Sequence, residues 1–210
     1  MRKIAVMLFG LLVMFGSSGV QAAVTADMAP EQLVRQTTSE ILATIKQNRE
    51  EYVRDHAKLY QLAQTKVLPY FDFDRMSQWV LGRYWRTATP AQRARFVVLF
   101  RDLLVRTYST ALLQYTDQRI RYLPVNAAPG DRQVLVRTEV QQSNGAPDIP
   151  IFYSFYKTGK GQWKVYDVSL DGVSLVTNYR SVYAGKIRQG GMNALLQSMT
   201  ATDTNLRKKK

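Results

Sequence analysis

The chain has 210 residues, with 29 Lys and Arg against 16 Asp and Glu, a formal net charge of +13 and no cysteine. The lack of cysteine excludes disulfides, thiolate metal sites and a lipid anchor on a cysteine at a cleavage point. This length favours one domain with a sizeable core, and the positive charge serves either solubility or attraction to anionic membranes and acidic partners.

The first 22 residues have the pattern of a secretory signal peptide. Arg2 and Lys3 precede an uncharged apolar run over residues 4–15, and Val20-Gln21-Ala22 fits a cleavage site of small residues. The run is about 12 residues, whereas a spanning helix needs roughly 20. We therefore expect an exported protein that does not span the membrane and does not bind nucleic acid. Its parts are a signal peptide (1–22), a single α+β domain (23–200) and a basic, disordered tail (201–210).

Helical spacing dominates the first half of the chain. A helix is expected from Pro30, a second from about Arg54 to Leu68, and a third after Asp72, which is a suitable N-cap. Pro69 ends the second of these helices.

The clearest helix start is Thr89-Pro90-Ala91-Gln92. Thr is the N-cap, Pro takes the first helical position, and Gln follows three residues after the cap, which is a capping box. Apolar side chains then recur at three- and four-residue spacing from residue 96 to residue 112, so we expect an amphipathic helix of about five turns.

The apolar period then changes to two. Strands are expected over residues 119–123, 133–141, 149–157 and 162–170, joined by short turns that favour an antiparallel sheet. Ser174 can cap a further helix, Gly190-Gly191 is expected to break it, and residues 192–199 form a last short helix. The sequence predicts an α+β fold in which helices pack on one face of a sheet of about four strands and enclose an apolar cavity.

The sequence contains few candidates for catalysis. His56, the only histidine, lacks the spacing of a metal site or a triad and is expected at the surface. Asp72 and Asp171 fit a helix cap and a turn. Asp167 lies among apolar neighbours in a strand, where it either pairs with an arginine or acts as a buried base. No metal, cofactor or catalytic residue is predicted.

Three sequence blocks resemble the MlaC family, also described as toluene-tolerance auxiliary proteins. The first combines residues 68–73 (LPYFDF) with residues 80–85 (VLGRYW), and the second combines residues 87–93 (TATPAQR) with residues 96–100 and 103–108. The third combines residues 163–168 (WKVYDV) with residues 172–176 and 178–180. The resemblance covers about residues 67–196 in the same order. Residues 23–66 agree in pattern only, and the lysine tail has no match.

The resemblance implies an NTF2-like cone as the fold. It also implies that the protein is a periplasmic carrier of glycerophospholipid and not an enzyme. The implied partners are an outer-membrane lipoprotein–porin complex and an inner-membrane ABC transporter with an MCE-domain protein, and the implied role is to maintain outer-membrane lipid asymmetry. The cargo would have its acyl chains inside and its head group near solvent.

We expect the cavity between the sheet and the helices. Large apolar side chains from both layers are the candidates for its lining, and the sequence does not separate cavity wall from filled core among them. They are Phe71, Met76, Trp79, Val80, Tyr84, Phe100, Leu104, Tyr108, Val136, Phe155, Val168, Val173, Val176 and Tyr179. Two alternatives stay open: a small enzyme on an NTF2-like scaffold with Asp167 as base, and a periplasmic interaction module with a solid core.

Overall fold

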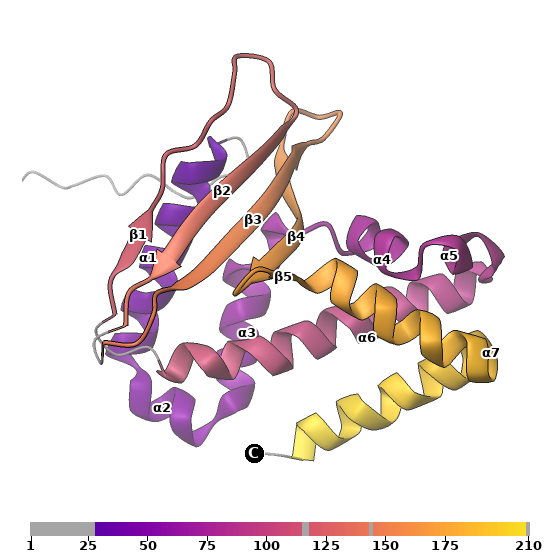
Figure 1. Cartoon of the computed structure of the whole chain (residues 1–210). Helices are drawn as coiled ribbons and strands as arrows, with labels where there is room; N and C mark the ends of the chain where they lie inside the picture. Colours follow the sequence, from indigo (N-terminus) through magenta and orange to yellow (C-terminus); the bar gives the residue numbers. More distant parts are fainter. Residues whose placement is uncertain (1–27, 115–117, 143–144, 209–210) are drawn as a thin grey trace, which may run out of the picture.

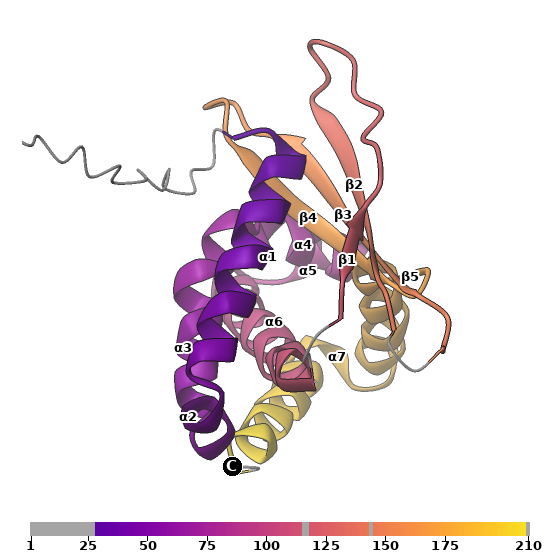
Figure 2. The ribbon, with the colours of Figure 1, turned by 90° about the vertical axis from the view of Figure 1, so that its left-hand side faces the viewer.

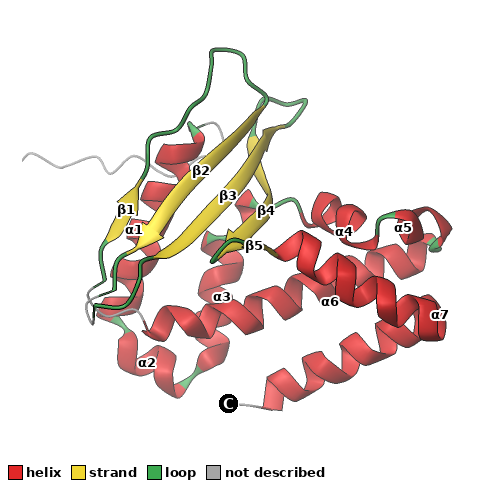
Figure 3. Cartoon of the chain, viewed as in Figure 1, coloured by secondary structure: helices red, strands yellow, loops and turns green. Residues whose placement is uncertain are grey.

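A computed structural model describes residues 28–114, 118–142 and 145–208, and the predicted signal peptide lies outside these residues. Helices come first, strands follow, and a long helix ends the described chain (Figures 1 and 3). The α-helices are α1 (Pro30–Gln47), α2 (Arg49–Arg54), α3 (His56–Lys66), α4 (Phe73–Leu81), α5 (Arg83–Thr87), α6 (Pro90–Ser109) and α7 (Leu175–Lys208). Two 3-10 helices are η1 (Leu68–Tyr70) and η2 (Thr110–Gln114), and the strands are β1 (Ile120–Tyr122), β2 (Gln133–Val140), β3 (Ile149–Lys157), β4 (Trp163–Leu170) and β5 (Val173–Ser174).

The second predicted helix is divided in the structure. Its start is at His56, because Asp55 interrupts the helix and its side chain accepts a hydrogen bond of 2.9 Å from the Ala57 amide. The helix ends at Lys66, and Leu68–Tyr70 forms a separate 3-10 turn around Pro69. An Asx cap thus stops one helix and starts the next within two residues.

Two predicted N-caps are confirmed. Asp72 accepts from the Arg75 amide at 2.8 Å and begins α4. At α6, Thr89 accepts from the Gln92 amide at 3.2 Å, and the Gln92 side chain accepts from the Thr89 amide at 2.9 Å. Both caps fix the helices that lie against the sheet.

The sheet is antiparallel and open, with the strand order β1-β2-β3-β4-β5. The four predicted strands are present, and the two-residue strand β5 adds a fifth, so the predicted number is short by one. Each strand pairs antiparallel with its sequence neighbour, although the connections range from ten residues between β1 and β2 to two between β4 and β5. In Figure 2 the helices α1, α3 and α6 lie on one side of this sheet, as predicted.

Helix α7 differs from the prediction at its end. Gly191 has φ 74° and ψ 179°, outside the helical region, so it breaks α7 into two helical segments as predicted, but the second segment continues beyond residue 199 to Lys208. Asp203 is buried and accepts hydrogen bonds from Arg106 at 2.9 Å and from Arg207 at 2.7 Å. The expectation of a disordered tail from residue 201 is therefore wrong for residues 201–208, and residues 209–210 lie outside the described chain.

Two apolar clusters form the interior. The main cluster joins the sheet to α1, α4, α6 and α7, and a small cluster of Ile41, Ile45, Tyr52, Leu59 and Leu113 lies among α1, α2, α3 and η2. Among the described helices, none combines the length and the hydropathy that crossing a bilayer requires.

Candidate functional site

The inward face of the sheet forms one wall of the candidate site. Alternate residues of β2 point toward the helices, so Val134, Val136 and Thr138 are buried whereas Leu135 is 45% exposed on the other face. The antiparallel register aligns these residues with Phe155, Tyr153 and Ile151 of β3. The period-two pattern of the sequence therefore produces a continuous apolar surface across the strands.

A bulge changes the direction of β4 within this wall. Phe155 pairs with Val165 but Ser154 pairs with Asp167, so that Tyr166 has no partner in β3. As a result Val165 and Val168, three residues apart, are both buried against the helices. The bulge also brings Asp167 to the start of α7.

The opposite wall comes from three helices that cross the sheet. Met76 of α4 and Phe100 of α6 are fully buried, and Leu104 of α6 and Val176 of α7 are nearly so. These helices contact one another and the sheet through side chains that repeat every three or four residues. The interior between the two layers is apolar on both sides.

The helical cover weakens along the strands. The row of Val134, Phe155 and Val165 is 1–7% exposed, so it is closed over. At the other end of the same face, successive rows keep partly exposed apolar side chains, and Ile149 is 37% exposed. These residues are Ile120 and Tyr122 of β1, Val140 of β2, Ile149 and Ile151 of β3, and Leu170 of β4. We call this group the open end of the sheet.

Tyrosine hydroxyls lie within the apolar interior. Tyr179 of α7 packs its ring edge-on against Phe100, with centroids 5.3 Å apart, and lies 5.5 Å from the ring of Tyr183. Burial, followed by the nearby Tyr108, raises the pKa of Tyr179 to about 12. Burial also raises the pKa of Tyr183, with a smaller contribution from Tyr179. The interior is therefore uncharged at neutral pH but holds hydroxyl groups.

A further tyrosine lies on the sheet wall beside the open end. Burial raises the pKa of Tyr153 to about 12, against the opposite effect of its hydrogen bond with Thr138. Thr138 in turn donates to the Ile151 carbonyl at 2.9 Å. A phenol and a hydroxyl thus meet next to the partly exposed apolar rows, where they can bond to ester oxygens of an amphipathic ligand.

The structure places the predicted lining residues in three environments. Eight lie buried in the main cluster, namely Met76, Val80, Phe100, Leu104, Val136, Phe155, Val168 and Val176. Four are partly buried against it, namely Phe71, Tyr84, Tyr108 and Tyr179. Trp79 and Val173 are 41% and 54% exposed and face solvent. Trp79 packs on Tyr166, away from the interior, and Val173 lies in the edge strand β5. Contact with a ligand stays a prediction for all of them.

Sequence reasoning missed the open end of the sheet. Tyr122, Ile151 and Leu170 share one row with Thr138, and their inward direction follows from the same alternation that predicts Val136. The register between strands, which no local pattern gives, was needed to align them. Tyr183 was also missed, although it lies one helical turn after Tyr179.

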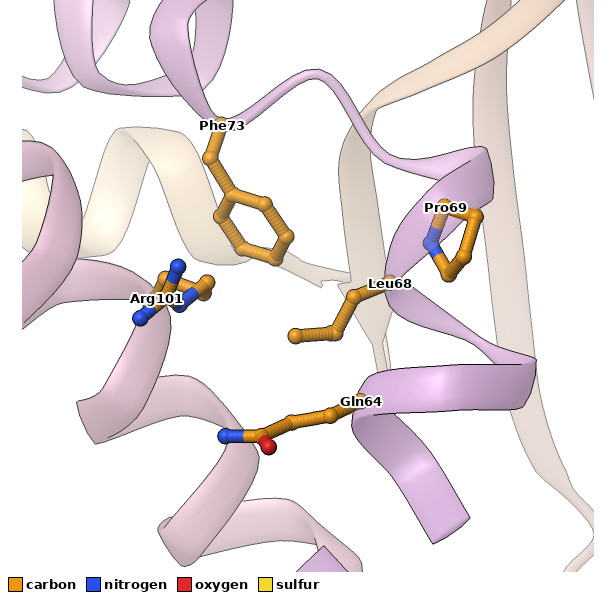
Figure 4. A pocket seen from close by; sticks show the side chains of 5 residues that line it. All are labelled: Gln64, Leu68, Pro69, Phe73 and Arg101. Carbon is orange, nitrogen blue, oxygen red and sulfur yellow. The ribbon is translucent and has the colours of Figure 1, made fainter. Parts of the chain in front are cut away.

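Two pockets open around Phe73 and Arg101, between the start of α4 and helix α6. The larger has a volume of about 440 Å³ and is lined by Gln64, Leu68, Pro69, Phe73 and Arg101 (Figure 4). The smaller, of about 370 Å³, adds polar residues such as Asp72, Asp74 and Lys164. Both are open and partly polar, so neither corresponds to the predicted enclosed apolar cavity, which stays a prediction.

The residues considered for catalysis have structural partners. Asp167 accepts from the Ser174 hydroxyl at 2.6 Å and from the Val176 amide at 3.1 Å, so it anchors the first turn of α7 and does not pair with an arginine. Ser174 caps the same turn, as predicted, by accepting from the Thr177 amide at 3.0 Å. His56 is half-buried at the start of α3, 6.4 Å from the ring of Tyr60. No group of three potential metal ligands occurs among the described residues.

Comparison with known proteins decides the family. Residues 35–201 match the family model described as MlaC protein. The chain belongs to the MlaC family. The chain is also 31% identical over 189 residues to the toluene tolerance protein ttg2D of Pseudomonas putida, covering 90% of this chain and 86% of that protein.

Two further relatives extend this result. The chain is 26% identical over 175 residues to the intermembrane phospholipid transport system binding protein MlaC of Haemophilus influenzae, covering 83% of this chain and 82% of the relative. A phospholipid-binding protein from Ralstonia solanacearum, solved in complex with a phospholipid, superimposes with a TM-score of 0.78 at 32% identity. The match covers 86% of this MlaC-family chain and 99% of the solved one. These matches confirm the predicted α+β fold and family, and such a binding protein is not an enzyme.

Proposed function

We propose that this protein is a periplasmic carrier that holds the acyl chains of a glycerophospholipid between its sheet and its helices. The observation that carries the proposal is the open end of the sheet, where inward-facing apolar side chains are only partly covered. An apolar face that is closed at one end and accessible at the other is suited to an inserted hydrocarbon chain. The phospholipid in the Ralstonia solanacearum relative supports the same ligand class.

The physical need for a carrier follows from the cargo. Burying one methylene group is favourable by about 0.8 kcal/mol, so two chains of about 16 carbons gross on the order of 24 kcal/mol. This exceeds the observed ceiling for non-covalent affinity of roughly 18–21 kcal/mol, so the ordering of lipid and protein must offset part of it. Escape into water is then very slow, and release requires a partner that offers another apolar path.

The head group is expected at the open end. Tyr153 and Thr138 are the nearest hydroxyl pair on the sheet wall, and they suit the ester oxygens common to all glycerophospholipids. Because the chains supply most of the contact, head-group selectivity is expected to be weak. A lipid extract of the purified protein that contains a single head group would contradict this part of the proposal.

The protein is proposed to exchange lipid between the two membranes and so to maintain outer-membrane lipid asymmetry. Its partners would be an outer-membrane lipoprotein–porin complex and an inner-membrane ABC transporter with an MCE-domain protein. The name of the Haemophilus influenzae relative, a binding protein of an intermembrane transport system, supports this role. The predicted signal peptide over residues 1–22 is in keeping with a location in the periplasm.

Native mass spectrometry of protein purified without detergent tests the ligand. The expected result is an added mass equal to that of a phospholipid, whereas a uniformly lipid-free mass contradicts the proposal. Ile151→Glu places a carboxylate at the open end and is expected to reduce lipid occupancy at least 10-fold, because a charge is unfavourable among acyl chains. Leu135→Glu is the matched control on the solvent face of the same sheet, and it should retain the lipid.

A further inference from the structure

Two segments of the chain contain no acidic residue. Six arginines and no Asp or Glu occur from Arg75 to Arg101, and two arginines and one lysine, again without an acid, occur from Gly172 to Thr202. A surface that mixes both signs of charge is the usual arrangement for solubility. Apart from Arg101, which pairs with Asp102, these cations therefore point to a concentrated positive field.

The fold brings these two segments together. Helix α7 packs along both α4 and α6. The α4–α5 junction lies beside Arg180, since a Cβ added to Gly82 would come within 3.3 Å of the Arg180 Nη2 atom. At the kink of α7, Asn193 accepts a 2.8 Å hydrogen bond from the Gln92 side chain of α6. Figure 1 shows α4, α5 and the first half of α7 grouped at one end of the molecule, away from the tips of the strands.

Three exposed arginines surround Tyr84 at this end, and we call Arg83, Arg180 and Arg188 the basic pole. Arg83 donates a 2.9 Å hydrogen bond to the Tyr84 hydroxyl, and its guanidinium lies 4.9 Å from the ring centre. The bond from Arg83 and the charges of Arg83 and Arg188 lower the pKa of Tyr84. Both arginines of α7 reach the α4–α5 segment, since Arg180 lies beside Gly82 and Arg188 acts on Tyr84.

Within the described part of the chain, the basic pole has no carboxylate partner. None of the ion pairs between described residues includes Arg83, Arg180 or Arg188, whereas Arg101 and Arg106 each pair with an aspartate. Arg93 nearby has a structural role, because it lies 5.5 Å from the ring centre of Trp85 and donates to the Arg86 carbonyl. The three arginines of the pole thus keep donors available for an anion from outside.

We propose that the basic pole is the surface on which this protein docks to the phosphate groups of an anionic phospholipid membrane. Planar guanidinium groups match the geometry of phosphate, and the amphipathic ring of Tyr84 suits the head-group region. A protein partner would be expected to cover an apolar centre. Val182 is the only large apolar side chain exposed within residues 83–95 and 180–188, so the pole lacks such a centre.

The role of this surface is distinct from cargo binding. The open end of the sheet takes the acyl chains in the proposed function, and the basic pole lies on α5 and α7, outside that interior. Attraction to a charged surface raises the time that the carrier spends near membranes without requiring release of its lipid. A loss of docking therefore leaves cargo occupancy unchanged.

Co-sedimentation with vesicles tests the docking surface. We expect the protein to bind vesicles of phosphatidylglycerol and phosphatidylcholine mixed 1:1 by weight at about 50 mM salt, and to bind far less at about 500 mM, where charges are screened over a few ångströms. Binding to pure phosphatidylcholine should be at background. The combined variant Arg83→Gln, Arg180→Gln and Arg188→Gln should lower the partition coefficient on the order of 100-fold, about 5-fold for each arginine.

The matched control removes the same charge at the tips of the strands. Arg132→Gln, Lys157→Gln and Lys160→Gln change three exposed cations there and should lower binding less than 5-fold. Equal losses in both triple variants would overturn the proposal, because net charge alone would then explain binding. Unchanged binding of the pole variant would overturn it too. So would a failure of the original protein to bind the mixed vesicles, which is the result expected for a surface that fits an acidic protein.

Two readouts keep the outcome interpretable. Native mass spectrometry should find the same lipid occupancy in both triple variants, which separates failure of docking from failure of cargo binding. If circular dichroism shows that the pole variant does not fold, the single variant Arg188→Gln, on the exposed side of α7, replaces it in the test. It is expected to lower the partition coefficient about 5-fold, and an unchanged value would overturn the proposal.

Discussion

The two apolar clusters of this molecule are built differently. The small cluster of Ile41, Ile45, Tyr52, Leu59 and Leu113 is made by helices alone. The main cluster lies between the sheet and the helices, contains tyrosine hydroxyls, and reaches the surface at the open end of the sheet. The first arrangement serves stability, whereas the second keeps an accessible apolar face that a stability role alone does not require.

A pair of identical truncations tests this difference most strongly. Leu59→Ala removes a fully buried side chain from the small cluster and is expected to lower the free energy of unfolding by about 4 kcal/mol, near the top of the range for such changes. Leu104→Ala in the main cluster should cost about 2 kcal/mol, because a lipid chain can occupy the vacated space. Urea unfolding of lipid-loaded protein measures both. Equal costs would remove the distinction between the clusters.

Alkaline unfolding sharpens the comparison through the tyrosines of the main cluster. The pKa of Tyr153 is raised to about 12, while an unfolded tyrosine titrates near its ordinary value of 10.0. The contribution of Tyr153 to the free energy of unfolding is fully present below about pH 10 and is lost as the pH rises toward 12. The reason is that Tyr153 keeps its hydroxyl proton to a higher pH in the folded state than in the unfolded state. The loss for Tyr153 is on the order of 2 kcal/mol.

The matched variant is Tyr153→Phe, which cannot ionise. Its free energy of unfolding should fall less steeply between pH 10 and pH 12 than that of the original protein. Slopes that coincide in the two proteins would show that Tyr153 is not shielded from water. Guanidinium unfolding at several pH values gives both slopes.

A smaller effect is expected at the start of α7, which forms part of the main cluster. Asp167→Ala removes the acceptor of the Ser174 hydroxyl and of the Val176 amide, so it should lower the free energy of unfolding by about 1–2 kcal/mol. Asp167→Asn retains an acceptor and should cost about half as much. Both variants are expected to keep bound lipid. Loss of a measurable chemical activity in Asp167→Asn with lipid retained would instead favour the enzyme alternative.

Local signals predicted the elements of this fold well. The caps at Asp72, Thr89 and Ser174 lie where the sequence placed them, because each depends on a side chain and an amide only two or three residues apart. The strand bounds followed from the period of two. The division at Asp55 was not predicted, since an Asx residue inside a polar helical pattern has little apolar periodicity to reveal a break.

The candidate site was harder to predict, because it depends on contacts that are distant in sequence. The alternation of β2 correctly placed Val136 inward, but only the register shows that Tyr122, Ile151 and Leu170 share a row with Thr138. Trp79 has helical spacing with Met76, yet it faces solvent because it packs on Tyr166 of the outer sheet face. The extension of the last segment of α7 from residue 199 to Lys208 likewise depends on tertiary contacts, including the pairing of Asp203 with Arg106.

Photo-crosslinking measures the position of the acyl chains in the protein directly. Protein loaded with a phospholipid that carries a photoreactive group along one acyl chain is irradiated, and the labelled peptides are mapped by mass spectrometry. We expect labels on the inward face of β2 and β3 and on the facing parts of α6 and α7, for example at Val136, Ile151 and Tyr179. Labels confined to the pockets around Phe73 and Arg101, or to the small cluster, would contradict this expectation.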